Sequence, residues 1–159
     1  MSQEPIYNLL QVGMKLEFGS HTFEADEIIR YAKKYDPQRF HVSEEGARNS
    51  IFGRLCASGW HTGAVWMRYN MAKFSEELKR LTEYRGTEPI IGPSPGLRDL
   101  KWPAPVYVGD TITFSSTLTG KRPSPRRAGW GLLTVNSTGV NQDGVMVISM
   151  DGAVSIRMD

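Results

Sequence analysis

Apolar residues recur at helical spacing over residues 24–35, near the start of the chain. They lie on one face of a helix, at Ala25, Ile28, Ile29, Ala32 and Tyr35. Pro37 disfavours helical backbone at the residue before it, so this helix is predicted to end near Tyr35 and to leave Asp36 at its C-terminal end. A further short helical turn is predicted from Ser43, a residue type that caps helix N-termini.

Residues 59–84 are predicted to form one long helix, within the longest stretch of the chain without proline. A stripe of apolar residues recurs there at intervals of four, three and four, at Trp60, Ala64, Met67 and Met71, and it is broadened by Val65 and Phe74. Between Trp60 and Met71, Arg68 carries the only formal charge. This profile is typical of a helix buried against a sheet, whereas the charged second half is expected to reach solvent.

The second half of the chain has the alternating pattern of strands. Strands are predicted over residues 14–18, 97–102, 111–119, 130–140 and 145–156. Turn-forming sequences separate the later ones, with a loop at Gly92–Gly96 and turns at Val108–Asp110 and Asn141–Gly144.

This order of elements predicts the fold class. Helices followed by consecutive antiparallel strands indicate an α+β fold, in which a curved antiparallel sheet wraps around one long buried helix. The 159 residues contain no repeat and no low-complexity tract that would divide the chain. We therefore expect residues 1–159 to form a single domain.

Composition and charge exclude several classes of protein. Nineteen Lys and Arg against seventeen Asp and Glu give a net charge of +2, which argues against a general nucleic-acid binder. Cys56 is the only cysteine, so neither an internal disulfide nor a multi-cysteine zinc site is possible. The N-terminus lacks a signal peptide's apolar run, and no stretch reaches the ~20 apolar residues that cross a bilayer. We expect a cytoplasmic protein without a membrane partner.

Asp36 and His41 are the first candidates for chemistry. They are five residues apart across Pro37, a spacing that places both on one loop rather than on one helix face. A carboxylate and an imidazole on one loop can hold a water between them, one acting as base and the other as acid. No two histidines are four residues apart, so a helical two-histidine metal site is absent, and we expect no metal.

Gly59 is the second candidate, because it stands at the start of the predicted long helix. A helix N-terminus offers unpaired N–H groups and a partial positive charge, which suit a developing oxyanion. Glycine also lets a ligand approach the backbone closely. Close packing of the chain where the helix begins would explain the same glycine without any ligand.

These residues resemble a known family. The segments Tyr35–His41, Phe52–Gly53 and Ala57–Gly59 are similar to the hydratase motif of MaoC-like, (R)-specific enoyl-CoA hydratases, including the gaps from Asp to His and from His to Gly. Trp102–Asp110 resembles the family's Pro-Val…Gly-Asp segment, and the similarity extends from about Val12 to Ile156. Gln38 stands where the family usually has Asn, and Ser58 where it often has His.

The resemblance implies a hot-dog fold, a homodimer or higher homo-oligomer, and a reaction. Asp36 and His41 would activate water for addition to a 2-enoyl-CoA, giving a 3-hydroxyacyl-CoA, and the Gly59 amide would hold the thioester oxygen. Gln38, Phe40 and Ser58 are expected to line the substrate site. No separate cofactor is expected, because CoA is part of the substrate.

Other functions remain open at this point. An acyl-CoA thioesterase and a non-catalytic acyl-CoA-binding protein are alternatives on the same fold. A hydrolase triad of Asp36, His41 and Ser58 is disfavoured, because Ser58 lacks the Gly-x-Ser-x-Gly elbow.

The densest positive run lies between Lys121 and Arg127, with four cations in seven residues. A solvated hairpin loop is the simplest interpretation. The alternative is that Arg126 and Arg127 bind the CoA phosphates across a dimer interface.

Overall fold

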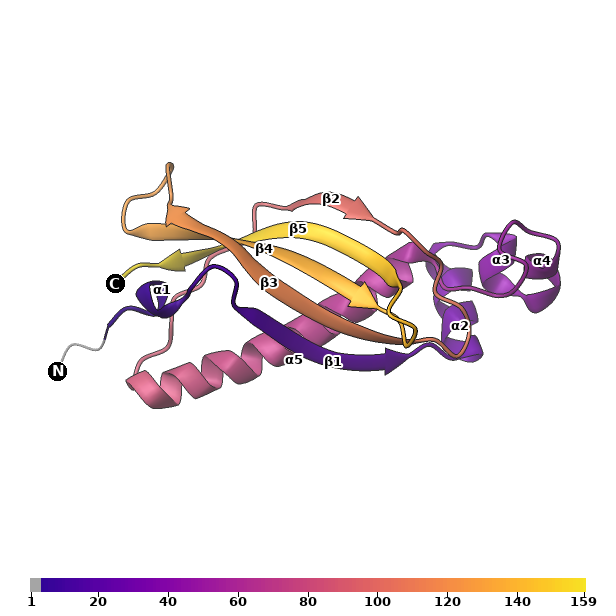
Figure 1. The fold of residues 1–159 in the computed structure, drawn as a ribbon, viewed down its shortest axis with the longest axis horizontal. Helices are drawn as coiled ribbons and strands as arrows, with labels where there is room; N and C mark the ends of the chain where they lie inside the picture. Colours follow the sequence, from indigo (N-terminus) through magenta and orange to yellow (C-terminus); the bar gives the residue numbers. More distant parts are fainter. Residues whose placement is uncertain (1–3) are drawn as a thin grey trace.

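The computed structural model describes residues 4–159 and forms one curved sheet with a long helix against it (Figure 1). In chain order the elements are α1 (Ile6–Leu9), β1 (Lys15–Thr22), α2 (Ala25–Tyr35), α3 (Arg39–Val42), α4 (Glu44–Arg48), α5 (Gly59–Arg85), β2 (Leu97–Lys101), β3 (Thr111–Pro123), β4 (Trp130–Val140) and β5 (Met146–Arg157).

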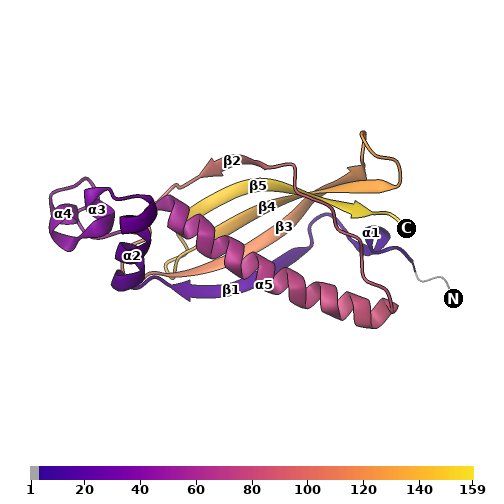
Figure 2. The same ribbon diagram turned by 180° about the vertical axis from the view of Figure 1, so that it is seen from behind.

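The sheet is antiparallel throughout and has five strands in the order β1-β3-β4-β5-β2. Helix α5 crosses one face of this sheet, and α2, α3 and α4 gather beside its N-terminus (Figure 2). β2, which follows α5 in the chain, returns to the edge of the sheet beside β5. The α+β fold with a sheet curving around one long helix is therefore confirmed.

Most predicted elements are present, with differences at their ends. The two main helices begin and end within one residue of the predicted positions, and the Ser43 hydroxyl caps α4 by accepting a hydrogen bond from Gly46 N. β1 continues to Thr22 through a bulge near Gly19, and β3 continues to Pro123. The predicted loop after residue 119 is therefore partly strand. Helices α1 and α3, each four residues long, were not predicted from the sequence.

The face of α5 that packs on the sheet agrees with the prediction only in part. The buried residues of the helix are His61, Thr62, Val65 and Trp66, of which Val65 belongs to the predicted stripe. In contrast, Trp60 is 61% exposed, Met67 45% and Met71 47%, so the main line of the stripe is exposed in the single chain. Because the first half of the helix is apolar on several faces, its periodicity could not distinguish these faces.

The main hydrophobic core lies between α5 and the sheet, where Val65 and Trp66 pack with Phe114, Ile148 and Met150. It continues towards α2 through buried residues that include Ile28 and Phe23. The residues from 36 to 58 are thus held against the N-terminal end of α5, at one end of the sheet.

Candidate active site

Asp36 lies at the C-terminal end of α2, where the position of Pro37 in the sequence predicts it. It is the C-cap residue, with φ −150° and ψ 71°, and its N–H donates to Ala32 O at 2.9 Å. Pro37 then prevents the helix from continuing. The carboxylate accepts two hydrogen bonds, from Ser58 Oγ at 2.6 Å and from Gln38 Nε2 at 2.9 Å.

His41 lies on α3, and its side chain is buried. Its Nδ1 is 2.7 Å from the carbonyl oxygen of Cys56. Because a carbonyl oxygen can only accept, Nδ1 must carry the proton, and the neutral ring then has its lone pair on Nε2. This Nε2 faces Asp36, 3.6 Å from Oδ2. The pair is therefore close enough to interact, and Nε2 is available to take a proton.

The protonation of Asp36 follows from its surroundings. Burial raises the pKa of the carboxyl group, but the hydrogen bonds from Ser58 and Gln38, together with His41, bring the pKa below its usual value. Asp36 is therefore a carboxylate at neutral pH, and it can stabilise a positive charge that develops on His41.

Ser58 connects this pair to helix α5. As the N-cap residue it accepts a hydrogen bond from Trp60 N at 3.3 Å, while its hydroxyl donates to Asp36. The next residue, Gly59, begins α5, so its N–H has no partner within the helix and carries part of the positive end of the helix dipole. Ser58 contacts Asp36 and not His41, which argues against a Ser-His-Asp triad.

A cavity of about 450 Å³ brings the predicted site residues together. Its lining includes Asp36, Gln38, Phe40, His41, Ser58 and Gly59. The cavity lies at the N-terminus of α5, and its other wall is the segment Trp102–Val106, which connects β2 to the turn before β3. Trp102 belonged to a recognised motif, but no role in the site was predicted for it.

Cys56 also lines the cavity, with its Sγ 3.7 Å from His41 Nδ1. Burial raises the pKa of this thiol to about 11, so it stays protonated at neutral pH. A protonated thiol is a poor nucleophile, and His41 Nδ1 already donates to a carbonyl. The geometry therefore does not favour a cysteine nucleophile.

The other two histidines do not line the cavity. His61 stacks on Tyr31 with ring centroids 4.5 Å apart, and burial lowers its pKa to about 4. His21 lies 2.7 Å from Glu27. Within residues 4–159, no group of three or more His, Cys, Asp or Glu side chains could hold a metal ion. No helix of the described part is long and apolar enough to cross a membrane.

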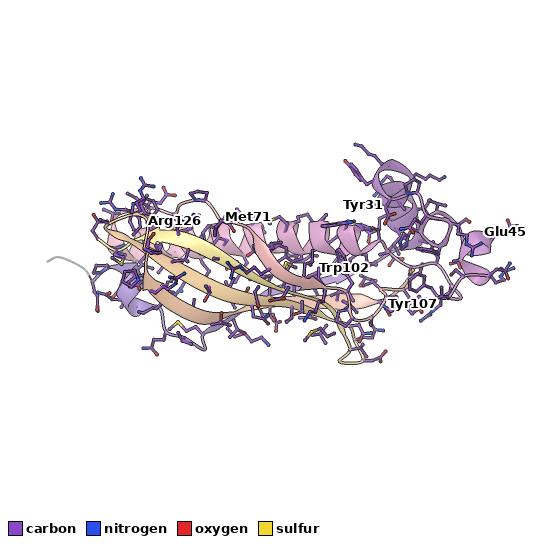
Figure 3. The ribbon with its side chains drawn as sticks, turned by 90° about the horizontal axis from the view of Figure 1, so that it is seen from above. Tyr31, Glu45, Met71, Trp102, Tyr107 and Arg126 are labelled. Carbon is purple, nitrogen blue, oxygen red and sulfur yellow. The ribbon has the colours of Figure 1, made fainter. Side chains whose placement is uncertain are left out.

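The predicted phosphate-binding arginines lie elsewhere. Arg126 is at the opposite end of the sheet from Trp102 (Figure 3). The Arg127 guanidinium packs over the Trp130 ring at 4.2 Å, and Lys121 Nζ donates to the carbonyl oxygens of Tyr7 and Leu10. The structure thus does not bring Arg126 and Arg127 to the cavity of the same chain, and a contact with substrate would require a second copy.

Comparisons with known proteins agree with this geometry. The model of the family described as "MaoC like domain" matches residues 8–136. The solved structure of a MaoC-like dehydratase from Rhodospirillum rubrum is 33% identical, with a TM-score of 0.74 and 94% of each chain covered. The R-hydratase PhaJ1 from Pseudomonas aeruginosa is 18% identical over 98% of this chain and 86% of its own, with a TM-score of 0.64, which shows the shared hot-dog fold. The uncharacterised protein YdeM of Bacillus subtilis is 29% identical over 92% of this chain and 94% of its own.

Proposed function

Because this chain belongs to the MaoC-like domain family, we propose that it is a hydro-lyase that reversibly adds water to the double bond of a 2-enoyl-CoA or related acyl thioester. The observation that carries the proposal is the arrangement of Asp36 and His41 in one cavity with the free N–H of Gly59. Hydration needs a proton acceptor for water and a donor for the thioester oxygen, and this cavity offers both.

His41 acts as the general base. Its Nε2 takes a proton from water while the water oxygen bonds to the β-carbon of the substrate. The electrons of the double bond move towards the thioester carbonyl, and the Gly59 N–H binds the oxygen that becomes negative. The imidazolium of His41 then returns its proton to the α-carbon, so that one water is added in total. The carboxylate of Asp36 stabilises the imidazolium between these steps.

Gln38 and Ser58 support this chemistry by holding Asp36. Each donates one hydrogen bond to a different carboxylate oxygen, which fixes the orientation of the group and keeps it ionised. Gln38 therefore supplies an amide donor where the family usually has Asn. Phe40 lines the same cavity and gives it an apolar wall for the acyl group.

The test is a panel of enoyl-CoA substrates of different chain lengths, followed by the ultraviolet absorbance of the conjugated thioester and by a thiol reagent. Hydration removes the absorbance without releasing thiol. Thiol release would instead identify a thioesterase. Binding without either change, across the whole panel, would identify a non-catalytic acyl-CoA-binding protein.

We also propose that the protein is a homodimer. The exposed stripe on α5 contains Trp60, Met67 and Met71, and Leu97 at the edge strand β2 is 48% exposed. Exposed large apolar residues and a free strand edge are both features of surfaces that pair with another chain. A second copy related by a two-fold axis is the commonest partner for such a surface.

A further inference from the structure

An aromatic side chain packs directly on the backbone of Gly59. A Cβ atom added to Gly59 would lie 2.6 Å from Cδ2 and from Cε2 of Trp102, well inside van der Waals contact. The indole therefore occupies the space beside Gly59 that any side chain would need. Glycine at this position is required by Trp102, whether or not a ligand also approaches the backbone.

Two features hold Trp102 in this place. It directly follows β2, and the chain after it returns to the site, where Ala57 N donates to Val106 O at 2.8 Å. Trp60 contacts the indole edge-on, with ring centroids 5.0 Å apart and an interplanar angle of 74°. Trp102 is 39% exposed and Trp60 is 61% exposed, so Trp60 forms the outer part of this aromatic pair.

The contact has a consequence for the Gly59 amide. The indole packs against the Cα of Gly59, the atom next to this N–H, and so restricts the movement of the backbone there. A hydrogen-bond donor that is already held in place needs no reorganisation when the oxygen becomes negative. The indole therefore helps to keep the donor in a fixed position.

We propose that Trp102 is a positioning residue for the oxyanion: its indole, in contact with Trp60, packs on the backbone at the N-terminus of α5 and fixes the Gly59 N–H. This inference rests on the proposed hydratase function. Trp102 acts through Gly59 and not by proton transfer, so its role should appear in the stabilisation of the negatively charged thioester oxygen.

The first test compares three variants by steady-state kinetics. Trp102→Ala should lower kcat by about tenfold with a smaller change in KM, because the lost interaction strengthens in the transition state. Trp102→Phe should recover most of this loss, since phenylalanine keeps an apolar ring over Gly59. Trp60→Ala is the matched control that removes an indole without uncovering Gly59, and its effect should be smaller. Equal losses for Trp102→Ala and Trp60→Ala would overturn the inference.

The second test is a double-mutant cycle with Gly59→Ala. This substitution keeps the backbone N–H but displaces Trp102, so it should lower kcat by an amount similar to Trp102→Ala. The double variant should then be no worse than either single variant, because the indole that clashes with the new methyl group is gone. Losses that multiply would mean that the methyl group acts independently of Trp102, and would contradict the proposal.

A spectroscopic measurement separates this inference from the proposed function. In an Asp36→Asn background, which should bind an enoyl thioester without converting it, the carbonyl stretch of the bound thioester reports the hydrogen bond from Gly59. Adding Trp102→Ala should reduce the shift to lower frequency while binding persists; an unchanged shift would overturn the role of Trp102. If the wild-type protein binds but hydrates no substrate, the proposed function fails, and this shift alone decides the inference.

Discussion

The two ends of the sheet use polar residues in opposite ways. At the cavity end, formed by residues 36–59, the side chains of Asp36 and Ser58 and the ring of His41 all have specific hydrogen-bond partners. At the hairpin end, formed by residues 121–130, Lys121 binds backbone carbonyls and Arg127 lies over an aromatic ring. The partners at the cavity end fix which atom carries a proton, whereas the hairpin end offers only positive charge. We therefore expect the reaction to take place at the end formed by residues 36–59. The end formed by residues 121–130 would contribute only to substrate affinity.

The largest expected effect is the loss of the proposed catalytic pair. His41→Ala should lower kcat by about 100-fold or more, the scale of losing general acid–base catalysis. Asp36→Asn should cause a loss of about the same size, because it removes the charge that stabilises the His41 imidazolium during proton transfer. Asp143→Asn, an exposed loop change, is the matched control for the charge. Kinetics on the best substrate of the panel measure the loss, and thermal unfolding checks that the variants fold. Full activity in either variant would remove the pair from the mechanism.

A substitution on the exposed stripe of α5 tests the proposed dimer. In that dimer a second copy would bring the hairpin end of one chain near the cavity of the other. Met67→Glu places a charge in the proposed interface and should convert a dimer into monomers of 17.8 kDa, as measured by light scattering. Lys79→Glu, on the exposed second half of the same helix, should leave the dimer intact. A wild-type protein that is already monomeric at micromolar concentration would contradict the dimer.

Ser58→Ala should have an intermediate effect, because it removes one hydrogen bond from Asp36 and the N-cap of α5. We expect kcat to fall by about tenfold and stability to fall by about 1 kcal/mol. Ser115→Ala, a buried serine in β3, is the matched control. If Ser58→Ala retained wild-type kcat, the orientation of Asp36 would not depend on this hydroxyl.

The same variant changes the pH dependence in a defined direction. The pKa of Asp36 is lowered in the folded protein, so its ionised form contributes stability above the pKa of the unfolded chain. This contribution is lost as the pH falls through the lower, folded-state pKa. Without the Ser58 hydroxyl the pKa of Asp36 should rise and the contribution should shrink. Carbon-13 NMR of the carboxyl group measures the pKa directly.

The grouping of residues at the cavity end could be predicted because its geometry is local in sequence. Pro37 ends a helix beside Asp36, and Gly59 begins the next long helix, so the motif spacing already implied one site. The proton on His41 Nδ1 could not be predicted, since its partner is the backbone carbonyl of Cys56 from another loop. The hydrogen bond from Ser58 to Asp36 could not be predicted either, because it joins residues 22 positions apart in the chain; the predicted contact of Ser58 with substrate stays a prediction.

The position of the basic run was harder to predict, for a different physical reason. Its composition indicates positive charge but not the end of the sheet at which the hairpin lies. Because β3 is 13 residues long, the basic run lies at the end of the sheet far from the cavity (Figure 3). The packing face of α5 was predicted only in part, for a related reason. Sequence periodicity identifies an apolar stripe, but it does not say whether the sheet or a second copy covers that stripe.

The smallest expected effect concerns Arg126 and Arg127, whose contact with substrate depends on a second copy. In a two-fold dimer with antiparallel α5 helices, the hairpin end of one copy would lie towards the cavity end of its partner. The double variant Arg126→Ala, Arg127→Ala should then raise KM for an acyl-CoA several-fold, but not for an acyl-pantetheine, which lacks the CoA phosphates. kcat should be unchanged, because the contacts bind the ground and transition states equally.

Salt and dimer dissociation provide the controls for this last prediction. The KM difference should shrink at high salt, since exposed charges are screened over a Debye length of about 8 Å near physiological ionic strength. It should also disappear in the Met67→Glu background, where no partner supplies the arginines. Arg122→Ala, an exposed cation on the same hairpin, tests whether total charge alone explains the effect. An equal change in KM for both substrates would make the hairpin a solvated loop, and the two ends of the molecule would then be functionally independent.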